Sequence, residues 1–267
     1  MPETIKISQD QGITTIQLNR AEKKNAMSLQ MMDEFIAAGR AIADDSECRA
    51  VTLTGDGDSF CSGLDLADLM KLGGDVAKTK EILATSLDDT GANQFQLPCT
   101  IWRQLDVPVI AVLRGNVLGA GAQLALGADY RIAAPDTRFS IMEAKWGLIP
   151  DMGISQALPA LMPADHALEL FATGRVLDAS EALELGLISK VMDNPDAAAK
   201  DLVAQISAAS PDAVAASKEL VREQWGRSEA SLKLEAELQS KLIGSPNQME
   251  KTMASMQKRD PIFKPRG

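Results

Sequence analysis

Residues 114–123 read RGNVLGAGAQ, and this stretch decides the fold together with its counterpart FCSGLD at residues 60–65. A glycine lets the backbone approach a neighbour or a ligand closely. Gly119-Ala120-Gly121 follows an apolar run and begins a helical pattern, so unpaired N–H groups and the positive end of a helix dipole should meet there. Two such N–H groups aimed at one oxygen form an oxyanion hole. Tight packing of a helix on a strand is the alternative explanation of these glycines.

Composition narrows the class of protein. The formal net charge of −10 over 267 residues argues against a nucleic-acid partner. Every apolar stretch is interrupted by charge before it reaches the length of a membrane span, and residues 1–5 lack the pattern of a secretory signal. Three scattered cysteines and one histidine predict reduced thiols and no metal site. We therefore expect a cytoplasmic protein with no nucleic-acid, membrane or metal partner.

Apolar periodicity predicts short strands that alternate with helices. Helices are expected from Ser28 to about Ala43, over residues 93–105, and from Ala120 onward. Residues 72–92 show no clean period and are expected to form a long loop. Strands are expected over residues 4–8, 13–18, 50–53, 109–113 and 130–133.

The C-terminal part differs in composition. From about Pro195 the chain is rich in Ala, Leu, Glu and Lys at helical spacing, and Pro211 and Pro246 mark helix starts. We therefore expect an α/β core over residues 1–194, followed by a helical region over residues 195–267.

Glu143 is the leading candidate for acid/base chemistry. It lies among Phe, Ile, Met and Trp in residues 139–151, and desolvation there would raise the pKa of its carboxyl toward a useful value. Asp151 lies eight residues further on and could fold back toward the same cavity. The structural alternative is that Glu143 pairs with Lys145 or Arg138 while Asp151 caps a helix.

Five segments, taken in order, resemble the crotonase (enoyl-CoA hydratase/isomerase) superfamily across nearly the whole chain. The resemblance implies a spiral core of ββα units and a helical C-terminal region that makes trimers or dimers of trimers. It also implies acyl-CoA thioester substrates, with no cofactor beyond the coenzyme A of the substrate. The five segments are residues 18–28, 60–66, 115–129, 139–152 and 173–188.

The resemblance also implies roles for individual residues. The N–H groups of Leu64 and Ala120 would form an oxyanion hole for the thioester carbonyl, and Glu143 would be the general acid/base. The acyl-CoA channel would be lined by Ser62, Gly63, Asp65, Leu66, Gly119 and Gly121. The coenzyme A phosphates would be met by Arg20, Lys23, Lys24 and Lys264. The alternative for these four cationic residues is that they form a solvated basic face.

Gln123 departs from the pattern of the family's hydratases, which have a second glutamate at this position. An amide can hold a water or a substrate oxygen, but it cannot exchange a proton near neutral pH. A 1,3-proton shift needs only one base, so the residues favour isomerisation over hydration. Asp151 matches an acidic residue of dienoyl-CoA isomerases, although their other aspartate would fall on Gln123. A hydratase, a non-catalytic acyl-CoA-binding member, and other chemistry that uses an oxyanion hole remain as alternatives.

Overall fold

A mixed sheet forms the centre of the molecule in the computed structural model, which describes residues 3–225 and 229–262. Its strand order is β1-β2-β3-β4-β6-β8, and only the β1–β2 hairpin is antiparallel. This is the α/β class that the sequence predicts. The strands are β1 (Ile5–Asp10), β2 (Ile13–Leu18), β3 (Ala50–Gly55), β4 (Val109–Leu113), β6 (Tyr130–Ala133) and β8 (Lys190–Val191).

Helices cover both faces of this sheet, which is why β4 reads VIAVL and is buried along its whole length. On one face α9 (Pro195–Ser207) packs Ala199 and Val203 into a small cluster with the strands. The other face carries the main core, in which Phe35 meets the edge of Trp102 with ring centroids 5.9 Å apart. Three helices supply much of this core: α1 (Leu29–Ala43), α4 (Leu97–Gln104) and α5 (Ala120–Gly127).

Most element boundaries agree with the sequence prediction. Helix α1 begins after Ser28, whose hydroxyl accepts the Met31 N–H at 3.1 Å, and α5 begins at Ala120 as expected. Helix α4 begins four residues later than predicted. The Asn93 side chain accepts the N–H groups of Phe95 and Gln96, which closes a turn ahead of the helix.

The prediction of a long loop over residues 72–92 is wrong for residues 72–84 and holds for residues 85–92, which form no helix or strand. Two helices occupy the first part, α2 (Leu66–Gly74) and α3 (Val76–Ala84), and Asp65 and Asp75 cap their N-termini. Helix α2 buries Asp68 and exposes Leu66 and Met70. The buried residues of α3 are Thr79 and Leu83, so apolar spacing gave little sign of this helix.

A second, two-stranded sheet brings the middle of the chain alongside the core. Strands β5 (Asn116–Leu118) and β7 (Arg138–Ser140) pair in parallel, and the 3-10 turn η2 (Glu143–Trp146) follows β7. The remaining short elements are η1 (Ala21–Lys23), α6 (Ile154–Ala157), η3 (Leu158–Ala160), α7 (Ala164–Thr173) and α8 (Ala179–Glu184).

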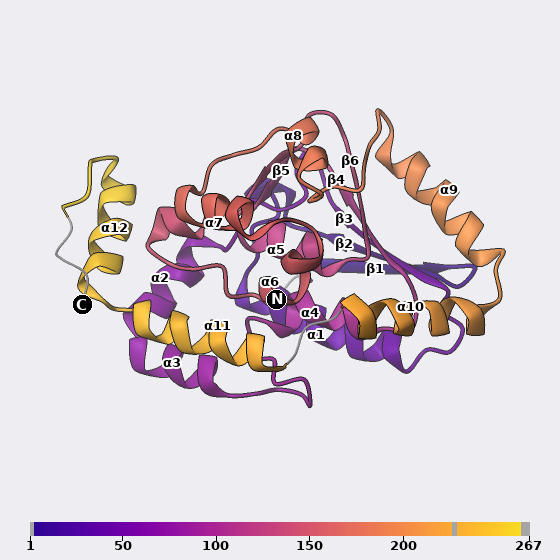
Figure 1. Cartoon of the computed structure of the whole chain (residues 1–267), viewed down its shortest axis with the longest axis horizontal. Helices are drawn as coiled ribbons and strands as arrows, with labels where there is room; N and C mark the ends of the chain where they lie inside the picture. The colour runs from indigo at the N-terminus through magenta and orange to yellow at the C-terminus, as the bar shows by residue number, and fades with distance from the viewer. Residues whose placement is uncertain (1–2, 226–228, 263–267) are drawn as a thin grey trace.

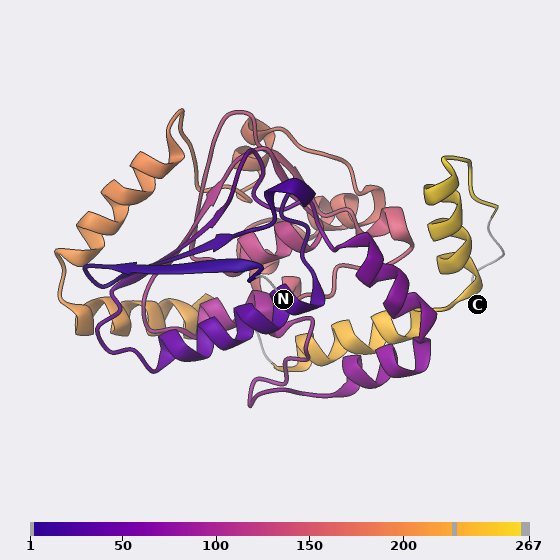
Figure 2. The ribbon, with the colours of Figure 1, turned by 180° about the vertical axis from the view of Figure 1, so that it is seen from behind.

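The chain is helical from Pro195 onward, as predicted, in the residues that the structure describes. Figures 1 and 2 place α9 and α10 at one end of the molecule and α11 and α12 at the other, with α11 alongside α3. No helix of the described residues combines the length and apolarity needed to cross a membrane. The last three helices are α10 (Pro211–Trp225), α11 (Glu229–Leu242) and α12 (Pro246–Gln257).

Substitutions at the contact between α1 and α4 can test how tightly the core is packed. A methyl group at Gly39 of α1 would lie 2.6 Å from Ile101 Cδ1 of α4. We expect Gly39→Ala to lower the free energy of unfolding by about 1–3 kcal/mol through overpacking, and Ile101→Ala to lower it by about 2–5 kcal/mol through a cavity. With Ile101 already shortened, Gly39→Ala should become neutral or stabilising, measured by urea unfolding. Gly73→Ala is the control, because nothing lies within 4 Å of its methyl position. Simple additivity of the two core changes would contradict this packing.

Candidate active site

Backbone pairing brings the two glycine segments together. The Cys61 N–H donates to Asn116 O at 2.9 Å, and the Leu118 N–H donates to Cys61 O at 3.0 Å. Beyond this bridge the chains stay close, because a methyl group built on Gly119 would lie 3.8 Å from the Gly63 Cα. The segments that the sequence singled out therefore meet where β5 ends and α5 begins.

The N–H of Leu64 points away from its neighbouring strand. Met27 donates to Gly63 O at 2.8 Å and accepts from the Asp65 N–H at 2.8 Å, so Met27 pairs with both neighbours of Leu64. Successive residues of an extended strand face opposite sides. The Leu64 N–H therefore points to the other side, and it donates to no acceptor among the described residues.

The N–H of Ala120 is available for a helical reason. Ala120 is the first residue of α5, and the first N–H groups of a helix have no partner within it. Gly119 precedes it at φ +52° and ψ −119°, and its position offers no side chain to cap the helix. In the described part of the chain the Ala120 N–H meets no protein acceptor. Gly121 packs instead, since a methyl group there would lie 2.6 Å from Cys61 Cβ.

Glu143 lies beside Gly119, the residue that precedes Ala120. Its Oε1 lies 3.6 Å from a methyl position built on Gly119, and its Oε2 is buried without a hydrogen-bond partner in the described structure. Burial raises the pKa of Glu143 to about 7, although its own backbone N–H and the amide of Gln123 work in the opposite direction. Among the described residues Glu143 forms no ion pair, so the alternative of a pair with Lys145 or Arg138 is not observed.

Gln123 connects Glu143 to the segment around Asp151. Its side chain is buried in α5, its Nε2 donates to Glu143 Oε1 at 2.7 Å, and its Oε1 accepts the Met152 N–H at 2.8 Å. Asp151 comes directly before Met152 and is partly buried. Asp151 is thus next in the chain to Met152, whose backbone N–H contacts the site.

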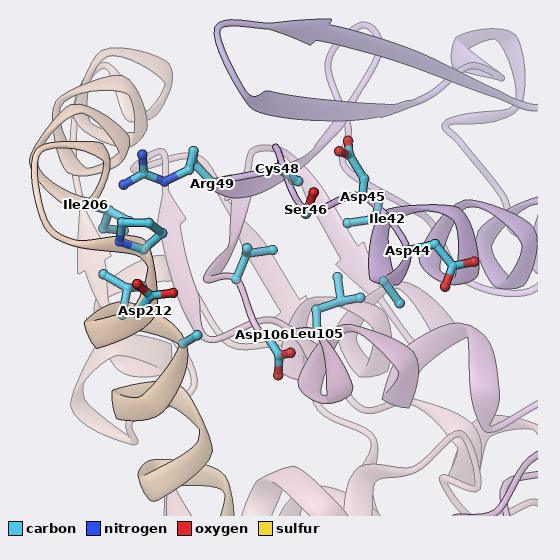
Figure 3. A pocket seen from close by; sticks show the side chains of 15 residues that line it. Ile42, Asp44, Asp45, Ser46, Cys48, Arg49, Leu105, Asp106, Ile206 and Asp212 are labelled. Atoms are coloured by element: carbon cyan, nitrogen blue, oxygen red, sulfur yellow. The ribbon is translucent and has the colours of Figure 1, made fainter.

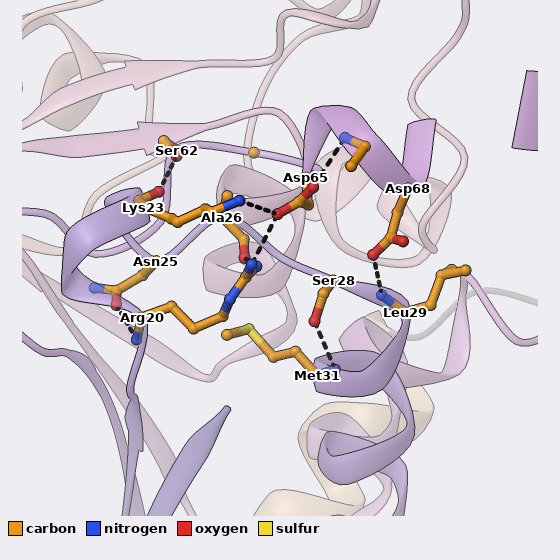
Figure 4. A network of polar contacts seen from close by, with 12 residues as sticks. Arg20, Lys23, Asn25, Ala26, Ser28, Leu29, Met31, Ser62, Asp65 and Asp68 are labelled. Atoms are coloured by element: carbon orange, nitrogen blue, oxygen red, sulfur yellow. Dashed lines mark hydrogen bonds and ion pairs between the residues drawn. The ribbon is translucent and has the colours of Figure 1, made fainter. Parts of the chain in front are cut away.

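Arg20 and Asp65 bind each other (Figure 4). Their ion pair is 2.8 Å long, Lys23 lies 3.8 Å from the same carboxylate, and Asp65 also accepts the Ala67 N–H at the start of α2. Burial would raise the pKa of Asp65, but the bond from Arg20 and the bond from the Ala67 N–H outweigh it, so the pKa lies below its usual value. The guanidinium thus braces the segment that carries Leu64.

The other residues proposed for coenzyme A lie nearby at the surface. Ser62 donates its N–H to Lys24 O at 3.0 Å, and Lys23 and Lys24 are exposed. Leu66 is exposed at the start of α2. Lys264 lies outside the described residues. The roles of these residues in coenzyme A binding stay predictions.

Two positioning contacts escaped the sequence reasoning. Asn25, at φ +54°, is buried and donates to the carbonyls of Asp56 and Ser59. These bonds hold the loop that carries Lys23 and Lys24 against the residues just before the first glycine segment. An asparagine tolerates this left-handed conformation, so its place in the motif was a usable signal. The Met152 N–H that holds Gln123 is a backbone group and leaves no sequence signal at all.

A pocket of about 300 Å³ lies elsewhere, between the end of α1 and the start of α10 (Figure 3). Four carboxylates line it, and its one guanidinium, Arg49, donates to the carbonyls of Ser207 and Ala209. None of its lining residues belongs to the site around Glu143. The carboxylates of this pocket repel phosphates, so we do not expect coenzyme A to bind there. The four carboxylates belong to Asp44, Asp45, Asp106 and Asp212.

Comparison with known proteins identifies the family. The model for enoyl-CoA hydratase/isomerase matches residues 8–266. The mitochondrial Delta(3,5)-Delta(2,4)-dienoyl-CoA isomerase of Mus musculus is 35% identical, over 97% of this chain and 81% of that protein. The probable enoyl-CoA hydratase echA8 of Mycobacterium bovis is 33% identical over 67% of this chain, which spans only 64% of that relative. A crystal structure of an enoyl-CoA hydratase/isomerase from Pseudoalteromonas atlantica T6c superposes with a TM-score of 0.82 at 25% identity, covering 98% of this chain and 100% of the other. The chain therefore belongs to the enoyl-CoA hydratase/isomerase family, and the crotonase resemblance is confirmed.

The raised pKa of Glu143 predicts a pH-dependent cost in stability. An unfolded carboxyl titrates near 4.5 and the folded one near 7, so the folded state loses stability as the pH rises between these values. Glu143→Gln removes this titration. Its free energy of unfolding, relative to the natural protein, should therefore grow from pH 5 to pH 8 by up to roughly 3 kcal/mol. Urea unfolding across this range measures the change, and a constant difference would show that the pKa is not raised.

The Arg20–Asp65 pair predicts the opposite pH dependence. Because the pKa of Asp65 is depressed, its contribution is complete above the ordinary value of 3.8 and is lost as the pH falls below it. Asp65→Asn should lower the free energy of unfolding by about 1–3 kcal/mol at pH 7, and by progressively less as the pH falls below 3.8. The exposed Arg114–Asp196 pair supplies the control, since Asp196→Asn should cost no more than about 1 kcal/mol. Equal losses from both variants would argue against a bracing role for Asp65.

Proposed function

We propose that this chain is an enoyl-CoA isomerase, in which Glu143 is the only proton carrier and the N–H groups of Leu64 and Ala120 hold the thioester oxygen. One observation carries the proposal: a buried carboxyl with a pKa of about 7 lies beside Gly119, where the two glycine segments meet, and its side-chain partner is an amide. The N–H groups of Leu64 and Ala120, which flank this point, meet no acceptor among the described residues. A base that titrates near neutral pH can both take and return a proton.

The reaction follows from this arrangement. Glu143 removes a proton from C2 of a 3-enoyl thioester, and the electron pair of the C2–H bond moves toward the carbonyl oxygen. The N–H groups of Leu64 and Ala120 stabilise the resulting dienolate, since fixed donors in a water-poor site need no reorganisation. Glu143 then gives the proton that it carries to C4, a deuteron in D2O once the carboxyl has exchanged with solvent, and the double bond moves from C3–C4 to C2–C3. No second acid and no added cofactor enter this scheme.

Hydration is the second candidate function, because relatives such as echA8 are named enoyl-CoA hydratases. Water addition needs one group to activate the water and another to protonate C2. Gln123 can hold a water through the free hydrogen of its amide, but it cannot supply or remove a proton. The name of the mouse relative, a dienoyl-CoA isomerase, supports the first candidate. The cytoplasmic location remains a proposal that rests on cysteine usage and composition, and the trimer or dimer of trimers remains a proposal that rests on family likeness.

Binding of coenzyme A to an acidic protein needs local positive charge. Arg20 and Lys23 both pair with Asp65, but Arg20 is largely buried in its pair, whereas Lys23 and Lys24 are exposed next to Ser62. We therefore assign the phosphates to the two lysines. In this assignment Arg20 acts by holding the loop rather than by touching the ligand.

Mass spectrometry of 3-enoyl- and 2-enoyl-CoA products formed in D2O tests the proposed function. We expect 3-enoyl-CoA to become 2-enoyl-CoA, with deuterium exchange and no gain of a water molecule. Glu143→Gln should lower kcat/KM by about 10²–10⁴-fold, because the proton carrier is lost. Its affinity for acyl-CoA, measured by calorimetry, should be largely unchanged. Addition of water by the natural protein would make it a hydratase, and binding without turnover across both substrates would make it a non-catalytic member.

A further inference from the structure

We propose that Gln123 is a positioning residue that holds Oε1 of Glu143 and so makes Oε2 the atom that carries the proton. The inference deepens the proposed function and rests on it for its catalytic meaning. Its structural part concerns only how one side chain orients another, and it can be tested without turnover.

The orientation of the Gln123 amide is determined by a backbone group. The Met152 N–H can only donate, and it lies 2.8 Å from the Gln123 side chain, so the oxygen of the amide must face it. The nitrogen of the amide therefore faces Glu143, where Nε2 lies 2.7 Å from Oε1. A flipped amide would set two donors against each other at Met152 and two acceptors against each other at Glu143.

This bond makes the two oxygens of Glu143 unequal. Oε1 accepts a hydrogen bond from an amide donor, and a protonated oxygen is the weaker acceptor, so a proton on Oε1 would weaken that bond. Oε2 is buried and has no hydrogen-bond partner in the described structure, so a proton there breaks no such bond. Oε2 is consequently the oxygen that can gain and lose a proton at the lower cost.

The same helix aligns this oxygen with the oxyanion donors. Ala120 and Gln123 are three residues apart in α5 and lie on one side of it. The Gln123 N–H donates to Gly119 O at 3.0 Å, and Gln123 is 2% exposed, so its position is determined by packing. The base and the Ala120 N–H are therefore held by one rigid element. This suits a reaction in which one oxygen must reach two carbons of the same substrate.

A glutamate at position 123 would change the chemistry of the site. One of its oxygens would accept the Met152 N–H, and the other would face Glu143 Oε1 at a distance near 2.7 Å. Two carboxylates this close share a proton and titrate in two separate steps. Gln123 instead leaves a single titration. The amide thus keeps Glu143 as a single base with one active oxygen.

The test compares Gln123→Met and Gln123→Glu with the natural enzyme in the pH dependence of kcat/KM for 3-enoyl-CoA isomerisation. Gln123→Met removes a donor to the charged carboxylate, so the acid limb should move up by about one pH unit. The rate should fall about tenfold at pH 6 and recover at alkaline pH. Gln123→Glu should give two titration steps, one of them above that of the natural enzyme. Gln94→Met is the control, because it breaks a similar bond to Asp33 outside the site and should leave the profile unchanged.

A second readout does not depend on activity. Infrared titration of the carboxyl carbonyl band, assigned by its loss in Glu143→Gln, reports the protonation of Glu143 directly. The band should titrate one pH unit higher in Gln123→Met, and should split into two steps in Gln123→Glu. If no enoyl-CoA is turned over but the band shifts as stated, the positioning role stands and the proposed function fails. An unmoved band in both variants, or a rate loss equal at every pH, would overturn the positioning role.

Discussion

The close approach of the two glycine segments is the constraint on which the rest of the site depends. A methyl group on Gly115 would lie 2.0 Å from Asp58 O, and one on Gly121 would lie 2.7 Å from Cys61 O. Side chains at these positions would force apart the backbones that pair at Cys61 and Val117. The N–H groups of Leu64 and Ala120 come from different segments, so they can face one space only if this pairing holds. Catalytic geometry here is therefore a consequence of backbone packing.

This geometry leaves a carboxyl group, that of Glu143, desolvated. Glu143 is desolvated in a chain of net charge −10, and its pKa rises to about 7 because no cation of the described residues offsets the burial. Asp65, which directly follows Leu64, shows the alternative, since Arg20 pairs with it and lowers its pKa. The fold thus contains a carboxylate that braces the structure and a carboxyl that is able to exchange protons. The two groups differ because Asp65 has the guanidinium of Arg20 as a partner and Glu143 has an amide.

The sequence predicted the elements whose signals are local. Ser28 caps α1, Ala120 begins α5, and Pro195, Pro211 and Pro246 begin helices, because capping and proline geometry depend on neighbouring residues alone. Helices α2 and α3 were missed because their buried sides include the polar residues Asp68 and Thr79. A prediction that assigns apolar residues to the buried face has too few of them to follow in such helices. The sequence also singled out Glu143 and Gln123, but not the bond between them, which joins residues twenty positions apart.

The choice between reactions depends on a contact that has no side-chain signature. By the family resemblance, Gln123 is an amide where the hydratases have a carboxyl, which says only that a proton carrier is missing. The Met152 N–H adds the direction of the amide, and that direction decides which oxygen of Glu143 is engaged and which is open. A site with one open oxygen and two fixed N–H donors can move a proton along a substrate more readily than it can add water to it. Under the proposed function, the backbone N–H that follows Asp151 therefore takes part in the chemistry by orienting Gln123, whatever the role of the Asp151 carboxylate itself.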